Sequence, residues 1–537
     1  MHSNFKRHNR VILFVLVFYT STYLLTASGI NLLRTDAGEL RFEVTKSIVE
    51  NFDVTVSPGE GVQGTDGRYY SWLGIGSAVL AVPFYIAGKF MGFPATAVYL
   101  MNPFFAAATA VLVLLFCISL GYSERSSLLV TICYGVGTIA WPYAKHPFDN
   151  IVETFFVLSS VYCMYLYSTN KKTLYILCSS SSLGLAFITR QTSLLIIPAL
   201  SILLLYPHFK SFAFTAMAKS VDRGVSLFVV ALLPFIGLIF WYDDYRFGSI
   251  FETGYSLIAS RMNIDFFTGT QLLTGFSGFL ISPGKGYFYY SPAAILFFFS
   301  IKSFVKKYSA LGACFICIFI TYLLFLSKNI YWHGDWAWGP RYLLVITPFL
   351  MIPVAQLFDS IAWLQKKSLR IASYVIITVS IVIQLAAVSV DFKKYFFYLI
   401  AERGIQFTVT RGYGVQPIIV PPSENYFEWN NSPILDQFKF INTMAFNLKN
   451  YRYSAPRRNS SLSDNLRGDP SYNVFDYWWL QKYCLYGRYS GFIWAVIFLC
   501  SAIFCGTRLL AVQQRVNEET NDGNTRKRKK KGKKGGK

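Results

Sequence analysis

Apolar stretches of about 20 residues recur along this chain, separated by short polar connections. A stretch of that length crosses the hydrocarbon core of a bilayer when it folds as a helix. Of the 537 residues, 53% are hydrophobic and 18% are aromatic, which is more apolar surface than one soluble core can bury. The pattern therefore predicts an all-α polytopic membrane protein.

The placement of the spans depends on one ambiguous segment, residues 72–88, which is apolar but contains Gly74, Gly76 and Pro83. When this segment lies along the membrane surface, the basic connections all fall on the cytoplasmic side, as the positive-inside rule requires. We therefore predict about 12 transmembrane helices, with an extracytoplasmic juxtamembrane helix after the first span. The predicted spans are 11–28, 94–119, 127–143, 151–168, 173–189, 192–206, 224–241, 291–304, 309–327, 341–358, 371–390 and 490–509.

This layout divides the chain into a transmembrane domain (1–390), an extracytoplasmic loop or small subdomain (391–489), a last transmembrane helix (490–509) and a basic cytoplasmic tail (510–537). The net charge of +22 does not indicate nucleic-acid binding, because Lys and Arg lie mainly in the short connections and the tail. The tail is either a solvated segment or a contact with anionic lipid headgroups.

The predicted outer loops carry compact strings of charged and aromatic residues, all on one side of the membrane. Two carboxylates, Asp36 and Glu39, follow the first span directly. Carboxylates can take a proton from an acceptor hydroxyl, Arg and Lys can hold a phosphate, and Tyr and Trp can stack on sugar faces. The other candidates in these loops are Arg68, Tyr69, His146, Asp149, Arg190, Tyr255, Lys285, His333, Asp335 and Arg341.

Several phrases in these loops resemble the GT-C superfamily of polytopic glycosyltransferases, which includes the protein O-mannosyltransferases and the lipid A aminoarabinose transferase. The resemblance covers roughly residues 10–360. It rests on TDAGEL (35–40), DGRYYSWLGIGSAVLAVPFY (66–85), LGLAFITRQTSLLIIPAL (183–200), RFGSIFETGY (246–255), SPGKGYFYYSP (282–292) and WAWGPRYLL (336–344). The WWDYG phrase of the oligosaccharyltransferase branch is absent, which disfavours transfer of a preassembled oligosaccharide to asparagine.

The resemblance implies an inverting transfer of a monosaccharide, a hexose or a pentose, from a polyprenyl-phosphate carrier to an extracytoplasmic glycan, lipid or protein. It assigns the catalytic base to Asp36, with Glu39 as its neighbour or as a second catalytic carboxylate, and the contact with the donor phosphate to Arg190. Lys285 and Arg341 are further phosphate candidates because of their charge and side. The resemblance also implies that the second outer loop completes the site, and substrate contacts are expected from Arg68, Tyr69, His146, Asp149, Tyr255, His333 and Asp335.

Other interpretations remain open at this point. The acids could sit at a helix N-terminus, Arg190 could reach from the interface, and His146 could be a satisfied loop histidine. The whole chain could be a transporter, a flippase for lipid-linked glycans, or a silent scaffold. Transporters place ionisable groups near the midplane of the bilayer, whereas the ionisable groups here gather at one surface. No metal-ligand spacing is present, so we expect no required metal or cofactor; we expect membrane lipids as partners and a bacterial plasma (inner) membrane as the location.

Overall fold

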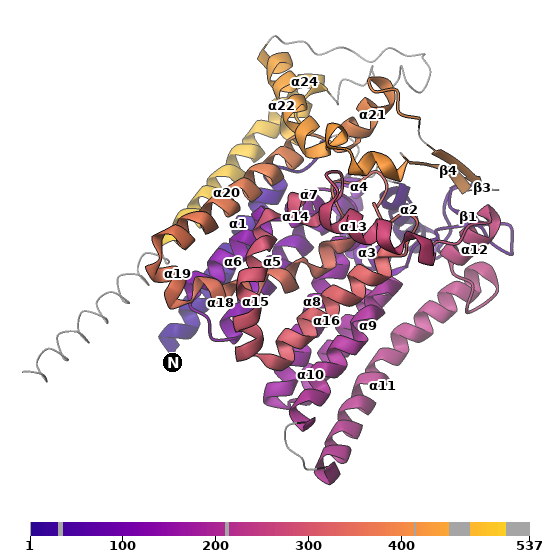
Figure 1. Ribbon diagram of the computed structural model, residues 1–537. Helices are drawn as coiled ribbons and strands as arrows, with labels where there is room; N and C mark the ends of the chain where they lie inside the picture. Colours follow the sequence, from indigo (N-terminus) through magenta and orange to yellow (C-terminus); the bar gives the residue numbers. More distant parts are fainter. Residues whose placement is uncertain are drawn as a thin grey trace, which may run out of the picture.

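The computed structural model shows a mostly helical chain in which helices gather into a bundle capped at one end by shorter elements (Figure 1). It describes residues 2–29, 36–58, 60–209, 214–406, 408–412, 415–420, 422–449 and 473–511. The first half contains α1 (His2–Leu25), α2 (Asp36–Glu50), β1 (Val62–Gln63), β2 (Tyr69–Tyr70), α3 (Gly76–Met91), α4 (Pro94–Tyr99), α5 (Met101–Ser119), α6 (Glu124–Gly137), α7 (Ala140–Ala144), α8 (Asn150–Asn170), α9 (Thr173–Thr189), the 3-10 helix η1 (Gln191–Ile196), α10 (Ile197–Phe209), α11 (Phe214–Phe247) and α12 (Gly254–Met262).

The second half continues the bundle and then adds a set of elements at its end. It contains η2 (Gly269–Gln271), α13 (Leu272–Ile281), α14 (Tyr287–Tyr290), η3 (Pro292–Ile295), α15 (Leu296–Lys307), α16 (Ser309–Ser327), η4 (Arg341–Ile346), α17 (Thr347–Met351), α18 (Val354–Phe358), α19 (Ile361–Gln365), α20 (Lys367–Ser389), α21 (Lys393–Ala401), β3 (Thr408–Gly412), β4 (Val415–Val420), η5 (Ser423–Phe427), η6 (Trp429–Asn431), α22 (Pro433–Lys449) and α24 (Trp478–Tyr486). Both strand pairs, β1 with β2 and β3 with β4, are antiparallel.

Seven helices among the described residues are long and apolar enough to cross a membrane, so the chain is an integral membrane protein of the polytopic, helical kind. They are Pro94–Ser119, Asn150–Asn170, Arg223–Phe247, Ser309–Ser327, Arg341–Phe358, Lys367–Ser389 and Ser490–Ala511. Each overlaps a span expected from the sequence. Three further expected spans correspond to shorter apolar helices, Asn9–Leu25, Thr173–Thr189 and Gln191–Leu205. The total of about 12 spans stays a prediction.

Of the two remaining expected spans, 127–143 is interrupted, whereas 291–304 begins as the short 3-10 helix η3, which leads directly into α15. α6 ends at Gly137, and Thr138 after it adopts an extended backbone. This break lies beside the start of η3, since the Ile139 amide donates to Ser291 Oγ at 3.1 Å. Non-helical backbone within a membrane requires such partners because lipid offers none. The sequence windows did not predict this interruption.

The juxtamembrane segment expected at 72–88 forms α3, which packs against α2, α4 and α9. At its start, a Cβ on Gly74 or Gly76 would lie within 2.6 Å of backbone atoms at the end of α9, so glycine permits this close approach. At its end, Gly88 lies equally close to the start of α4. Both neighbours are helix ends that we assign to the outer side, and the placement of α3 along the surface stays a prediction.

The segment 473–486, near the end of the sequence, packs against the C-terminal end of α1. The indole N–H groups of Trp478 and Trp479 donate to the carbonyls of Leu24 and Leu25 at 2.9 and 3.0 Å, and the Trp478 amide donates to Ala27 at 3.0 Å. Carbonyls at the end of a helix have no partner within the helix. The segment therefore supplies the C-terminal cap of α1.

Candidate functional site

A cavity of about 1060 Å³ lies where the outer loops converge. Its lining draws on all six segments that the sequence places outside, 29–93, 144–150, the Arg190 turn, 242–290, 328–340 and 391–489. Its volume is at the upper end of the range for small-molecule sites. The charged lining residues are Arg41, Asp149, Arg190, Asp243, Arg246, Asp265, Asp335, Arg341 and Lys393.

Another part of the lining is apolar. Aliphatic and aromatic side chains from η1, α11, α12 and α16 form it, namely Leu194, Leu195, Ile239, Ile258, Phe325 and Leu326. The cavity therefore combines ionic groups with a hydrocarbon wall. Such a mixture suits a ligand that is itself amphipathic.

Asp149 is the centre of the ionic part. Its two oxygens accept from Arg41 Nη2 at 2.8 Å and Arg190 Nη1 at 3.1 Å, while the Asp149 side chain is only 4% exposed. Burial alone would raise the pKa of Asp149, but the guanidinium groups of Arg41 and Arg190 outweigh it, so the pKa lies below its ordinary value. Asp149 is therefore an ionised anchor that fixes two guanidinium groups.

Glu153 holds Arg190 from a second direction. It follows Asp149 by one helical turn, so α8 presents both carboxylates on one face. Arg190 Nε lies 3.1 Å from Glu153 Oε2, and the other Glu153 oxygen accepts from Ser193 at 3.3 Å and Tyr322 at 3.4 Å. The Arg190 side chain is thus locked by two carboxylates and still lines the cavity.

Asp335 lies on a tight turn of the 328–340 loop, and Arg341 begins η4 directly after that loop. Gly334 and Asp335 both have left-handed backbones, with φ of +72° and +52°. Asp335 is not a glycine, so the surrounding structure must hold it in this conformation. Asp335 Oδ2 lies 3.7 Å from Arg341 Nη2. The Arg341 guanidinium also stacks over Phe148 and Tyr342, each at 4.9 Å. A third guanidinium thus joins the site.

Aromatic side chains complete the walls of the cavity. Trp336 stacks on Phe396 with ring centroids 5.1 Å apart, and Trp72 lies against Gly254, where a Cβ would approach its Cα within 2.3 Å. Tyr255, which the sequence predicts as a substrate contact, also lines the cavity and is 45% exposed. Rings of this kind present faces on which sugars can stack.

Five of the predicted residues therefore line the cavity: Asp149, Arg190, Tyr255, Asp335 and Arg341. Arg68 and Tyr69 do not; they lie on β2, where Arg68 pairs with Asp53 and Asp66 at 2.6 Å each. Glu39 is an exposed residue of α2 and is not part of the lining. Asp36 begins α2, but its side chain lies outside the described residues, as does most of the predicted basic tail.

Lys285 was expected to bind the donor phosphate, but the structure places its side chain away from the cavity lining. Its ammonium donates to the carbonyls of Asp335, Ala337 and Gly339 at 3.2, 2.8 and 3.3 Å, and its side chain is fully buried below the loop. Burial and the nearby Arg341 lower its pKa well below the ordinary value. Lys285 supports the turn that carries Asp335 rather than lining the cavity.

The two predicted histidines also lie below the surface of the cavity. His146 is 6% exposed and packs edge-on against Phe392 at 4.8 Å, and His333 is 3% exposed and stacks on Tyr426 at 4.8 Å. Burial, with Lys145 as the next cause, lowers the pKa of His146 to about 3. Neither ring is in the lining, so contact with substrate is not supported for either one.

The sequence did not single out five charged residues of the lining, Arg41, Asp243, Arg246, Asp265 and Lys393, nor Glu153, which holds Arg190. Arg41 follows Ala37 by four residues on α2, and helical spacing places both on the cavity face. Glu153 is a lone acid inside an otherwise apolar span, which is itself an indication of function. Among the described residues, no group of three or more His, Cys, Asp or Glu could hold a metal ion.

The long apolar helices define an integral membrane protein, and the ionic, aromatic-walled cavity lies among the loops that the sequence predicts to be outside. No protein-family model matches the chain, and no curated protein matches it. Solved structures similar to it include ArnT from Cupriavidus metallidurans in the apo state, at 11% identity over 94% of this chain and 78% of that chain, with a TM-score of 0.47. ArnT bound to undecaprenyl phosphate is similar at 12% identity over 91% and 77%, also with a TM-score of 0.47.

The Archaeoglobus fulgidus oligosaccharyltransferase in complex with Zn and sulfate is similar at 13% identity over 78% of this chain and 61% of that chain, with a TM-score of 0.46. No residue role is carried over from these proteins, because all three TM-scores are below 0.5.

Proposed function

We propose that this chain is a membrane glycosyltransferase that moves a monosaccharide from a polyprenyl-phosphate carrier to an extracytoplasmic glycan, lipid or protein. The observation that carries the proposal is the pair of guanidinium groups, Arg41 and Arg190, fixed on Asp149 in a cavity that also has a hydrocarbon wall. A phosphorylated lipid needs both surfaces in one site.

The guanidinium groups match the chemistry of a phosphate. Arg grips two oxygens of a phosphate at once and stays charged at every working pH. Arg190 and Arg341 both line the cavity, and their guanidinium groups lie over the same ring, Tyr342, at 5.5 and 4.9 Å. A phosphate between them would be stabilised as the sugar leaves it.

The base in this proposal is Asp36. It starts α2, whose next residues on the cavity side are Ala37 and Arg41. Asp149 is a poorer candidate because both its oxygens accept from guanidinium groups and its pKa is lowered. In the inverting reaction, the acceptor oxygen bonds to the anomeric carbon from the face opposite the phosphate. The bond from that carbon to the phosphate oxygen breaks, and the acceptor proton passes to Asp36.

The domain limits and the membrane side in this proposal are those predicted from the sequence. Residues 1–390 form the catalytic membrane domain, 391–489 contribute to the outer side, and 510–537 lie in the cytoplasm. The site faces the extracytoplasmic side of a bacterial plasma membrane. No cofactor is required by this chemistry.

The test is transfer by the purified protein, with a panel of polyprenyl-phosphate sugars offered to glycan and lipid extracts. We expect Asp36→Asn to abolish turnover without loss of folding, and Arg190→Ala to raise the donor KM by at least about tenfold, since a charge-assisted contact contributes about 1.5–3 kcal/mol. Glu43→Gln is the matched control, because Glu43 lies on the same helix and is not in the cavity lining.

Near wild-type turnover in Asp36→Asn would show that Asp36 is not the base. An unchanged donor KM in Arg190→Ala would show that Arg190 does not bind the donor phosphate. If the protein instead moves lipid-linked sugars across liposome membranes without transferring them, it is a flippase or transporter.

A further inference from the structure

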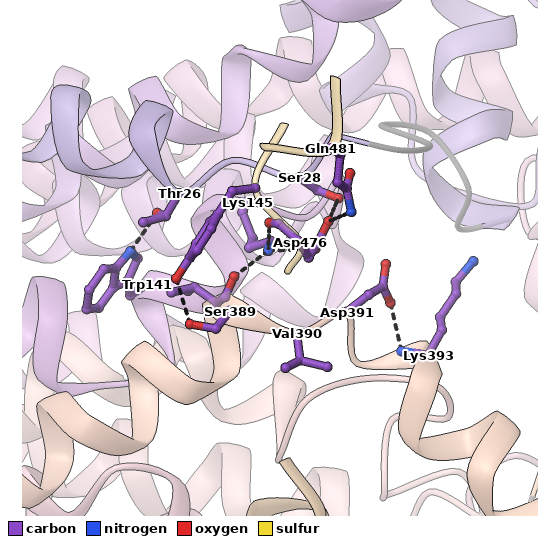
Figure 2. A network of polar contacts seen from close by, with 12 residues as sticks. Thr26, Ser28, Trp141, Lys145, Ser389, Val390, Asp391, Lys393, Asp476 and Gln481 are labelled. Atoms are coloured by element: carbon purple, nitrogen blue, oxygen red, sulfur yellow. Dashed lines mark hydrogen bonds and ion pairs between the residues drawn. The ribbon is translucent and has the colours of Figure 1, made fainter. Parts of the chain in front are cut away.

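A second buried ionic network lies beside the cavity and joins three distant parts of the chain (Figure 2). Lys145 Nζ lies 2.6 Å from Asp476 Oδ2 and donates to the carbonyls of Val388 and Asp476 at 2.7 and 3.0 Å. The two side chains are 1% and 2% exposed. The ammonium therefore makes two hydrogen bonds to carbonyls and one close ion pair.

This pair is a costly way to hold a loop. Removing an ammonium and a carboxylate from water costs about as much as their attraction returns, and apolar residues of similar size often stabilise a protein as well or better. Lys145 keeps Asp476 charged: burial would raise the pKa of Asp476, but the ammonium lowers it below the ordinary value. In some proteins, a buried polar or ionic group instead fixes one arrangement of the chain.

One arm of the network reaches the end of the first helix. Asp476 Oδ1 accepts from Ser28 Oγ at 2.6 Å and from Gln481 Nε2 at 3.2 Å. Gly29 lies so close to the same segment that a Cβ would be 2.5 Å from Trp478 Cα. The chain therefore leaves α1 at a fixed point, eight residues before Asp36.

The other arm reaches the ionic centre of the cavity. Lys145 begins the turn that ends at Asp149, and Asn102 Nδ2 donates to two carbonyls within that turn at 2.5 and 2.8 Å. Arg41 Nη1 donates to the Pro147 carbonyl at 2.9 Å, and Arg41 also pairs with Asp149. Movement of Lys145 would therefore shift the Arg41 guanidinium and the Asp149 carboxylate.

We propose that Lys145 and Asp476 are positioning residues for sugar transfer: their ion pair sets the place of the 145–149 turn relative to the end of α1. Residues 473–481 are thereby part of the catalytic apparatus. This inference rests on the proposed function for its kinetic test, and it has a second test that does not.

The kinetic test uses purified full-length variants. Asp476→Asn and Lys145→Met are expected to lower kcat by about 10- to 100-fold, because a displacement of about 1 Å has such effects. The donor KM is expected to stay within about threefold, since Arg190 keeps its contact with Glu153. Wild-type kcat in Asp476→Asn would overturn the proposal.

The double variant Lys145→Met/Asp476→Leu separates positioning from stability. It removes both charges and restores apolar packing, so thermal stability should return toward the wild-type value while kcat stays low. If kcat returns together with stability, the pair is merely structural and the proposal is overturned. Asp436→Asn is the matched control, because Asp436 is equally buried in the same outer segment and pairs with Arg403 at 3.0 Å. It should lose stability without a change in kcat.

Hydrogen exchange supplies the test that needs no activity. Amides of 145–149 should exchange faster in Asp476→Asn and in the double variant than in wild type or in Asp436→Asn. Unchanged exchange there would overturn the inference. If wild type transfers no sugar from any carrier, the proposed function fails, and exchange alone decides whether the ion pair holds this turn.

Discussion

The buried His146 makes the stability of this protein sensitive to acid, by an amount that can be worked out. Its pKa is about 3 in the folded chain, against 6.5 for a free imidazole. The folded-state pKa is therefore the lower one, and the contribution to stability is complete above about pH 6.5 and is lost as the pH falls from there toward 3. At about pH 5 the loss is about 2 kcal/mol, from 1.5 units at 1.36 kcal/mol each.

The perturbation is His146→Phe, which keeps an aromatic ring against Phe148 and Phe392. The free energy of unfolding is measured by denaturant titration in mixed micelles at about pH 7.5 and 5. We expect wild type to lose about 2 kcal/mol more than the variant between these pH values. His333 is buried in both proteins and its contribution cancels in the difference.

His146→Gln is the control for packing, since it is polar but does not titrate. It should show the same flat response as His146→Phe, whatever its absolute stability. Equal pH dependence in wild type and both variants would refute the reasoning, as would an increase in the donor KM of His146→Phe, because that ring is not in the cavity lining.

Two further predictions concern the ionic centre and the turn beside it. Asp149→Asn should lower stability by about 3 kcal/mol and raise the donor KM, because it leaves Arg41 and Arg190 short of a counter-charge. Because the pKa of Asp149 is lowered, Asp149 should stay ionised above about pH 5, and the pH–rate profiles of wild type and Asp149→Asn should have the same shape there. An acid limb above about pH 5 that is present in wild type and lost in Asp149→Asn would contradict the role of Asp149 as an ionised anchor. Lys285→Met should lower the free energy of unfolding by about 2 kcal/mol, because three buried carbonyls lose their hydrogen-bond donor. The donor KM should change less than about threefold. A KM effect as large as that of Arg190→Ala would return Lys285 to the site.

The long spans could be predicted from the sequence because a bilayer demands length and apolarity, and both are visible in a window such as 94–119. The interruption at Thr138 could not. The next amide, that of Ile139, donates to Ser291 Oγ, and a partner 152 residues away leaves no local signal. The same limit applies to the segment 473–486, whose bonds to α1 depend on the folded chain.

For the candidate site, charge and expected membrane side pointed to loops that line the cavity, but they did not indicate how deeply each residue is buried. Arg190 and Lys285 look alike in sequence, yet the first lines the cavity and the second serves three carbonyls below it. Arg41 required the helical phase of α2, and Glu153 required attention to a single acid in an apolar span. The carbonyls that capture Lys285 belong to a turn whose left-handed Asp335 is a consequence of tertiary structure.

The cap that Trp478 and Trp479 place on α1 also has a consequence for the order of synthesis. Ser28 and Asp476 are 448 residues apart, so at a translation rate of about 5–20 residues per second the first helix waits about 20–90 seconds for its partner. Throughout that interval its final carbonyls need water or another protein. The cap of α1 is therefore completed only after Trp479 has been synthesised, and a nascent chain halted before residue 473 would leave the end of α1 without it.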